Sequence, residues 1–513
     1  MNQSDISDNN NRIAKNTFML YLRMFFTMAV SLYTSRIVLN TLGIEDYGIY
    51  NVVGGVVSML AFFNSSMATS TQRFLNVEMG KGNYEILNKV FINAVNAHYL
   101  IGIVTVLGLE TFGLWFIYYK LNIPEAQFHA ALWVFHLSVA SLFVSIISTP
   151  YNAAIIANEK MSVYAYFSIF EVIAKLLIVY LLLMLPYNKL TVYAILLFLI
   201  SVTMRLAYNL YCKKYFRECN YRWIWDINLI KKMFSFTGWM LFGCLSDMLG
   251  NQGVNILINM FFGPVYNAAR GIAVQIRTAI DSFIVNFLTA VRPQIVKSYS
   301  TGEWDYMYKL TFSASRLSYY LLLLLVMPVF FSTHYILGIW LKNIPPYCEI
   351  FTQLTLVELL IRTTYTPIAQ INQASGKIRN YQLAISVLFL LNFILSYIVY
   401  KMGMPVFSSF IVAIVVAVVG LFVRLIILKH DNQFPALEYL KTVFLPIIPV
   451  TLLAIAIPVI YNIYSESSFQ TFFIQSVLCV LCASISIWYV GLNTGEKTVI
   501  KGKINSFVNR YMK

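Results

Sequence analysis

The chain has 513 residues, of which 59% are hydrophobic and only 12% are charged, whereas soluble proteins are about 45–50% apolar and about 25% charged. This composition excludes a disordered chain and an ordinary soluble enzyme, because so much apolar surface would aggregate in water. The net charge of +15 fits either a nucleic-acid partner or a membrane protein with basic cytoplasmic loops.

Apolar runs that are long enough to cross a bilayer recur from end to end of the chain. Short polar breaks separate these runs and leave no room for a separate soluble domain. The predicted spans are 17–39, 47–68, 90–118, 130–149, 163–185, 190–211, 233–261, 268–291, 312–331, 351–371, 383–400, 406–428, 443–461 and 471–492. We therefore expect an all-α polytopic membrane protein of about fourteen transmembrane helices.

The distribution of Lys and Arg predicts the topology. The polar, acidic start of the chain lacks a basic signal-peptide region, so the first span is expected to be retained. With the N-terminus in the cytoplasm, 25 Lys and Arg residues, Arg424 among them, fall in cytoplasmic segments and only 4 fall outside. This asymmetry predicts two cytoplasmic termini and explains the positive charge without nucleic acid.

An internal repeat predicts two related halves. Thr149-Pro150 and Thr366-Pro367 are 217 residues apart, and each is followed ten residues after its proline by a lysine. The Gly43 and Gly263 turns are 220 residues apart and fall at equivalent spans. The expected organisation is a six-helix lobe at 1–212, a cytoplasmic linker at 213–232, a second six-helix lobe at 233–430, and two extra helices with a basic tail at 431–513. Such parallel repeats place a substrate site between two halves of a transporter.

The sequence indicates neither enzymatic chemistry nor a cofactor. The five histidines are scattered, and no phosphate-loop, zinc-protease or serine-hydrolase pattern appears. Cys479 and Cys482 form an isolated CxxC inside an apolar run, which favours buried thiols over a metal or redox site.

Ionisable residues inside the predicted spans are the main functional candidates, because such residues are costly in a bilayer and usually face a protein interior or a cavity. Three pairs lie one helical turn apart, and each either joins helices or lines a functional cavity. These pairs are Glu171/Lys175, Arg277/Asp281 and Glu358/Arg362. Arg205 and Arg316 lie near cytoplasmic helix ends, where their side chains are expected to reach toward the headgroups.

Helical spacing brings several of these groups onto common faces. Arg270, Arg277 and Asp281 share one face of the eighth span. The seventh span carries a polar ladder, for which a cavity is favoured over a helix contact: Asp247, Asn251, Asn255 and Asn259. A cavity lined by guanidinium groups suits an anionic phosphate headgroup. Arg23, Glu358 and Arg362 are further candidates for substrate binding, and Arg36 is one for the cavity lining.

Several short motifs resemble those of the multidrug/oligosaccharidyl-lipid/polysaccharide exporter superfamily, and most closely its Wzx-type flippases of O-antigen and capsule repeat units. The motifs are Thr34–Leu39 running into Leu42-Gly43, Asp46–Tyr50, Gln72–Phe74, Pro150–Ala153 and Tyr266–Arg270. The resemblance covers nearly the whole chain, and the order and spacing of the motifs carry it together with the count of twelve plus two helices.

The resemblance implies a flippase of the bacterial inner membrane. It would move undecaprenyl-diphosphate-linked oligosaccharides by alternating access, with the lipid-linked oligosaccharide and membrane lipids as partners and H⁺ or Na⁺ as a candidate coupling ion. Its bending positions are expected at Gly43, Gly263, Pro150 and Pro367. The alternatives are a cation-coupled multidrug exporter that uses Asp247, Asp281 or Glu358, a lipid II flippase, a membrane-embedded transferase or polymerase, and a structural scaffold.

Overall fold

The computed structural model describes residues 3–58, 62–120, 125–184, 188–341, 344–465, 468–498 and 501, and no strand occurs among them. The helices are α1 (Gln3–Ser58), α2 (Phe62–Lys81), α3 (Tyr84–Gly108), α4 (Leu114–Lys120), α5 (Glu125–Ala157), α6 (Met161–Met184), α7 (Lys189–Tyr215), α8 (Ile227–Phe262), α9 (Pro264–Thr301), α10 (Trp304–Phe331), α11 (Thr333–Trp340), α12 (Cys348–Ser375), α13 (Arg379–Lys401), α14 (Ser408–Asn432), α15 (Ala436–Tyr439), α16 (Leu445–Tyr464) and α17 (Phe469–Ser486). Short π-helical segments at Leu109–Gly113, Leu440–Phe444 and Ile487–Gly491, and a 3₁₀ turn at Arg217–Cys219, complete the chain order.

The helices have the length and the surface of membrane spans. Ten helices in the described part of the chain are long and apolar enough to cross a bilayer. Large apolar side chains such as Leu452 in α16 and Leu177 in α6 are exposed, which lipid tolerates and water does not. The expected all-α, multi-pass membrane fold is confirmed. The count of fourteen spans agrees with the helix order and stays a prediction.

Glycine conformation explains where two helices break. Gly43 interrupts α1 with φ 83° and ψ 168°, between the first two predicted spans, and this region of backbone space is open essentially only to glycine. Gly263 has φ 92° and separates α8 from α9. The prolines of the repeat behave differently, because Pro150 lies inside α5 and Pro367 lies inside α12, so each helix continues beyond its proline.

The chain divides into two compact units. Unit 1 comprises Met1–Cys244 and Thr289–Trp304, and unit 2 comprises Leu245–Leu288 and Asp305–Lys513. The division therefore passes through α8 and α9 rather than through the polar segment at 213–232. The two six-helix lobes expected from the repeat remain a prediction.

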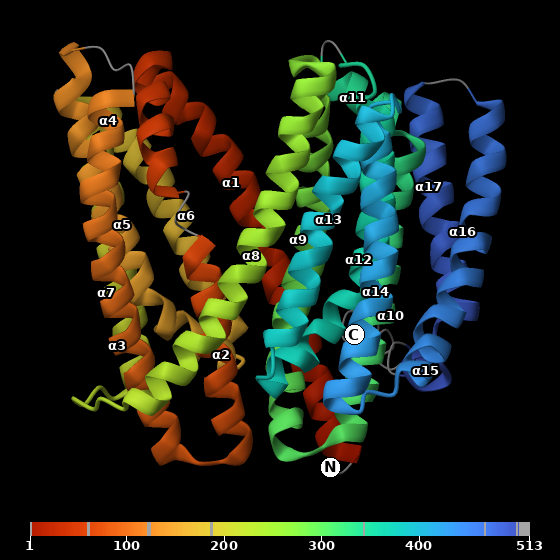
Figure 1. The fold of residues 1–513 in the computed structure, drawn as a ribbon, viewed down its shortest axis with the longest axis horizontal. Helices are drawn as coiled ribbons and strands as arrows, with labels where there is room; N and C mark the ends of the chain where they lie inside the picture. Colours follow the sequence, from red (N-terminus) through yellow and green to blue (C-terminus); the bar gives the residue numbers. More distant parts are fainter. Residues whose placement is uncertain are drawn as a thin grey trace, which may run out of the picture. The chain divides into compact units, whose positions relative to one another are not determined.

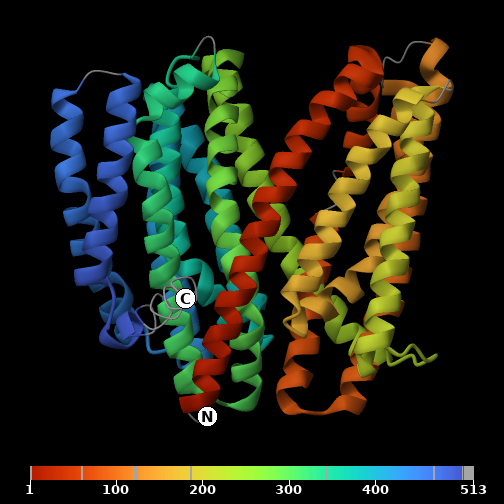
Figure 2. The same cartoon turned by 180° about the vertical axis from the view of Figure 1, so that it is seen from behind.

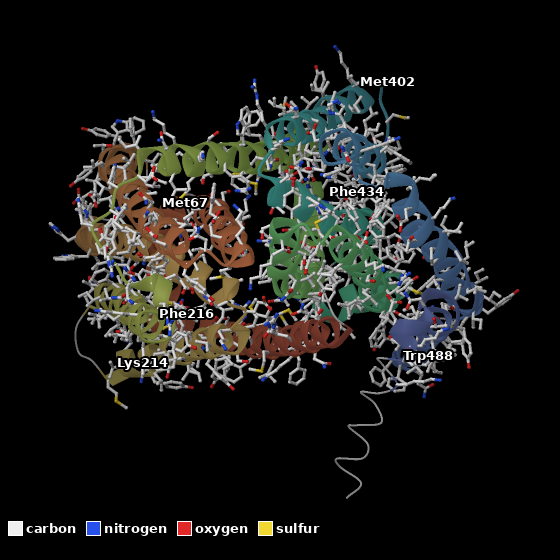
Figure 3. All side chains as sticks on the ribbon, turned by 90° about the horizontal axis from the view of Figure 1, so that it is seen from below. Met67, Lys214, Phe216, Met402, Phe434 and Trp488 are labelled. Atoms are coloured by element: carbon white, nitrogen blue, oxygen red, sulfur yellow. The ribbon has the colours of Figure 1, made fainter. Side chains whose placement is uncertain are left out.

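In unit 1, α5 packs against α2, α3 and α7, while α1 packs against α6; the red α1 and yellow α6 lie side by side in Figure 2. Asparagine side chains begin two of these helices, because Asn83 accepts from Ile86 N at 3.2 Å and Asn188 accepts from Thr191 N at 3.1 Å. Figure 3 shows Phe216 inside unit 1 and Lys214 at its margin, as expected from the burial of the first and the exposure of the second.

A buried carboxylate ties together three parts of unit 1. Glu159 lies in the turn after α5 with φ 58°, and its side chain is 1% exposed. Its oxygens accept from Gln294 Nε2 at 2.8 and 2.9 Å and from Lys297 Nζ at 2.7 Å. Arg12 Nε lies 2.7 Å from Glu159 Oε2. The end of α9 is thereby attached to the start of α1 and to the α5–α6 turn.

In unit 2, α14 packs against α12 and α13, and α16 packs against α17; the two blue helices stand together in Figure 1. Arg316 of α10 pairs with Glu496, which follows α17, and donates to Thr442 O at 3.3 Å. Arg316 is only 5% exposed. The sequence-based expectation that its side chain reaches toward the headgroups is therefore wrong, because acceptors from the C-terminal segments bind its two terminal nitrogens inside the protein.

Candidate functional site

Two adjoining cavities, of about 90 and 380 Å³, lie within unit 2. They are called the arginine cavity here, and both are lined by α8, α9 and α12, the smaller one also by α13 and α14. A close approach of helices positions one wall: a Cβ on Gly250 would come within 2.7 Å of Phe389 O. Glycine at this position allows α8 to pack directly on α13 and brings Asp247 and Asn251 to the cavity.

Charges of alternating sign run across the arginine cavity. Arg277 Nη2 of α9 lies 3.2 Å from Glu358 Oε2 of α12. The other oxygen of Glu358 lies 3.5 Å from Arg362 Nη1, and Arg362 Nη2 lies 3.9 Å from Asp247 Oδ1 of α8. Each carboxylate thus offsets the cost of holding a guanidinium away from water, and the chain of pairs links three helices.

The expected pairing of Arg277 with Asp281 is corrected by this geometry. Arg277 pairs across to α12, and Asp281 lines the larger cavity with no ion pair among the described residues. A side chain four residues away on one helix is a possible neighbour, but Glu358 reaches Arg277 from a packed helix. The other two one-turn pairs are confirmed: Glu358/Arg362 in this cavity and Glu171/Lys175, at 2.6 Å, in α6.

Arg270 differs from the other cavity arginines. Its side chain lines both parts of the cavity. Nη2 donates to Asn251 O at 3.1 Å, and the guanidinium carbon lies 6.0 Å from the centre of the Phe410 ring. Among the described residues, no carboxylate lies within ion-pair distance of it. Arg270 therefore offers a desolvated positive charge with donors left for a ligand.

Arg424 is a cavity residue that the sequence analysis missed. The charge pattern predicts a cytoplasmic position for it, yet it lies inside α14, is 7% exposed and lines the smaller cavity. It donates to Tyr381 Oη at 3.1 Å and Gly420 O at 2.9 Å, and it stacks 4.0 Å from the centre of the Tyr365 ring. Its place within a long apolar run was the signal that could have identified it.

Part of the polar ladder of α8 reaches the cavity. Asp247 and Asn251 line both parts, and Asn255 lines the larger part. Asn251 also bonds back to Asp247, with Nδ2 at 2.9 Å from the carbonyl and 3.3 Å from Oδ1. Asn259 is exposed and lines neither part, so the helix presents only three of its four ladder residues there.

The two remaining candidate arginines lie in unit 1. Arg23 of α1 donates to Ser168 Oγ at 3.5 Å and lies 4.7 Å from the centre of the Tyr164 ring, both on α6. The side chain of Arg36 lies outside the described part of the structure. Arg23 therefore takes part in an α1–α6 contact.

The sequence profile of a family described as "Polysaccharide biosynthesis protein" matches residues 13–299. No curated protein matches the chain at a significant level.

Several solved transporter structures share the fold. One is a MATE mutant with a TM-score of 0.70 and 13% identity, covering 82% of this chain and 97% of its own. An outward-facing multidrug resistance MATE family transporter of the MOP superfamily has a TM-score of 0.66, 13% identity and coverage of 82% and 97%. A MOP superfamily transporter from Pyrococcus furiosus, for which a reverse polarity of the binding pocket suggests a different function, has a TM-score of 0.64, 13% identity and coverage of 80% and 95%.

Proposed function

Because the chain belongs to the polysaccharide biosynthesis protein family, we propose that it is a flippase that moves undecaprenyl-diphosphate-linked oligosaccharide repeat units across the bacterial inner membrane. The MATE fold supports a transporter that works by alternating access. The product would be used for O-antigen, capsule or exopolysaccharide synthesis. The charge asymmetry of the loops supports a cytoplasmic location for both termini.

This proposal rests on one observation: the guanidinium of Arg270 lines the arginine cavity and has no ion pair among the described residues. A diphosphate carries negative charge that must be compensated when it enters a region of low dielectric constant. Arg270 supplies a guanidinium in the arginine cavity whose protein contacts are a backbone carbonyl and an aromatic ring. Charge-assisted bonds from arginine to phosphate are short, directional and independent of pH in the physiological range.

The paired groups would hold this site in shape. Glu358 fixes Arg277 and Arg362 on opposite oxygens, so either arginine can turn a second donor toward the ligand while remaining neutralised. Asp281 and Arg23 are further proposed binding residues. Gly43, Gly263, Pro150 and Pro367 are the proposed bending positions during transport.

A second candidate function is favoured by Asp281. Its carboxylate lines the larger cavity without an ion pair among the described residues, and such a carboxylate is the type of group that binds H⁺ or Na⁺ in coupled transport. Under this alternative, the chain is a cation-coupled multidrug exporter. Arg277 and Arg362 argue against a large cationic ligand at the same place. A lipid II flippase would share the diphosphate chemistry and differ in its sugar.

The test is transport of a fluorescent undecaprenyl-diphosphate oligosaccharide in vesicles that contain the purified chain. Arg270→Ala is expected to slow transport at limiting substrate about tenfold or more, since a charge-assisted bond contributes about 1.5–3 kcal/mol. Arg270→Lys keeps the charge and should retain part of the activity. Lys429→Ala, an exposed position in the last turn of α14, is the matched control. Transport at the parent rate by well-folded Arg270→Ala would contradict the proposal.

A further inference from the structure

A separate cavity, of about 670 Å³, lies within unit 1. Its walls are α3, Tyr151 of α5, α7, and the irregular segment at 219–225. This volume is in the range of ordinary small-molecule sites. All of its lining residues belong to unit 1, and the translocation proposed above makes no use of it.

The α7 wall of this cavity is cationic. Arg205, Asn209 and Lys213 are spaced four residues apart and therefore share one face of α7. The Arg205 guanidinium stacks 4.0 Å from the centre of the Tyr151 ring, and its Nη1 is buried and has no hydrogen-bond partner in the described part of the chain. Among the described residues that line the cavity, none carries a carboxylate. A buried guanidinium donor with no acceptor is costly, and an anionic ligand would remove that cost.

The irregular wall is fixed by three asparagines of α3. Asn88 Nδ2 donates to Glu218 O at 2.7 Å and to Asn220 O at 2.9 Å. Asn93 Oδ1 accepts from Asp226 N at 2.8 Å. Asn96 Nδ2 donates to Ile224 O at 3.0 Å. These bonds hold a segment without regular structure in one conformation, so the cavity is formed before a ligand arrives.

The rim of the cavity is aromatic and apolar. Trp223 and Trp225 stack with ring centroids 6.5 Å apart, and Trp223 is 81% exposed. Leu100 and Ile103 of α3 line the cavity and are also exposed. Tryptophan collects at the level of lipid headgroups, and exposed aliphatic side chains lie deeper, against acyl chains. The combination of a basic wall, an aromatic rim and an apolar edge matches a lipid with a charged headgroup.

We propose that this cavity binds the phosphate headgroup of an anionic phospholipid. Arg205 and Lys213 hold the phosphate, Asn209 donates to its ester oxygens, and the acyl chains lie along Leu100 and Ile103. A soluble phosphate would leave the apolar edge uncovered. Basic pockets between transmembrane helices on the cytoplasmic side are typical sites for anionic lipids, and the last turn of α7 contains Lys213 and Lys214.

Native mass spectrometry of the purified full chain, titrated with phosphatidylglycerol or phosphatidylcholine, tests the proposal. The parent is expected to bind one phosphatidylglycerol with an affinity at least about tenfold above that for phosphatidylcholine, as one charge-assisted contact allows. Lys213→Gln and Arg205→Gln should each weaken phosphatidylglycerol binding about tenfold, and Arg205→Lys should weaken it less. Thermal melting and elution volume show that each variant is folded.

Lys214→Gln is the matched control, because Lys214 neighbours Lys213, is exposed, and lies outside the cavity lining. It should bind phosphatidylglycerol like the parent. Equal losses in Lys213→Gln and Lys214→Gln would show general surface attraction and overturn the site. Parent-like binding by folded Lys213→Gln and Arg205→Gln would also overturn it.

The identity of the lipid is tested separately. If the parent binds an undecaprenyl-diphosphate oligosaccharide more tightly than phosphatidylglycerol, and the same variants lose this binding, the phospholipid assignment is overturned. Transport failure of Arg270→Ala has no bearing on any of these results.

Discussion

Lys297 Nζ lies 2.7 Å from Glu159 Oε1, so the carboxylate of the α5–α6 turn is joined to the last part of α9, well over a hundred residues further along the chain. Gln294 and Arg12 bind the same carboxylate. This end of α9 belongs to unit 1, although the start of α9 belongs to unit 2. The Glu159 cluster is one physical reason for that division.

Glu159→Gln is expected to destabilise the protein by about 1–3 kcal/mol, because it removes the charge that two cations share and leaves one partner bond of Gln294 unmade. The measurement is the midpoint of thermal unfolding in a mild detergent. Glu85→Gln is the control, since the Glu85–Lys89 pair lies on an exposed helix face and such pairs contribute about 0–1 kcal/mol. Equal effects of the two substitutions would contradict the assigned role of Glu159.

Exchange of the charges at Arg277 and Glu358 tests the cross-helix pair. Arg277→Glu alone would place two carboxylates within reach of each other and should lower the yield of folded protein. The double variant Arg277→Glu/Glu358→Arg restores opposite charges and should recover a large part of the thermal stability. Arg277→Glu combined with Asp281→Arg is the comparison, and should recover less. Equal recovery by both would mean that Arg277 interacts with Asp281 as strongly as with Glu358.

Alanine substitutions at two glycines of α1 should change the free energy of unfolding in opposite directions. Gly43→Ala is expected to cost about 1–3 kcal/mol through its backbone conformation, since no described atom lies within 4 Å of a Cβ there. A Cβ on Gly48 likewise meets none of the described atoms within 4 Å, but its position is helical. It should stabilise the helix by about 0.5–1 kcal/mol. Thermal unfolding of both variants, measured side by side, checks the prediction. Destabilisation by Gly48→Ala equal to that by Gly43→Ala would count against it.

The topology is tested with single cysteines in a background where the six native cysteines are replaced. Lys214→Cys and Lys401→Cys both lie at exposed helix ends, and the charge asymmetry predicts the first in the cytoplasm and the second outside. A membrane-impermeant maleimide added to intact spheroplasts should label only Lys401→Cys. Labelling of both, or of Lys214→Cys alone, would require a different orientation.

The sequence predicted the helical membrane fold and most of the charged residues that line the arginine cavity, because hydrophobic runs and charges within them are local signals. It could not predict the partner of Arg277, since Glu358 reaches it through packing of α9 against α12, and helical spacing favours Asp281 equally well. Arg424 was misplaced for a different reason: proximity to a helix end suggested solvent, while its tyrosine and backbone partners lie inside unit 2. The role of Glu159 could not be predicted from helical periodicity, because this residue lies in a turn.

The partners of Arg316 place a condition on the evolution of this chain. Thr442 and Glu496, which accept from the two terminal nitrogens of this buried guanidinium, both come from the segments around α16 and α17. A descendant that lost these two helices and their flanking segments would retain the charge of Arg316 without these two acceptors, which is costly away from water. Loss of the last two helices is therefore expected to be accompanied by a replacement of Arg316 in α10.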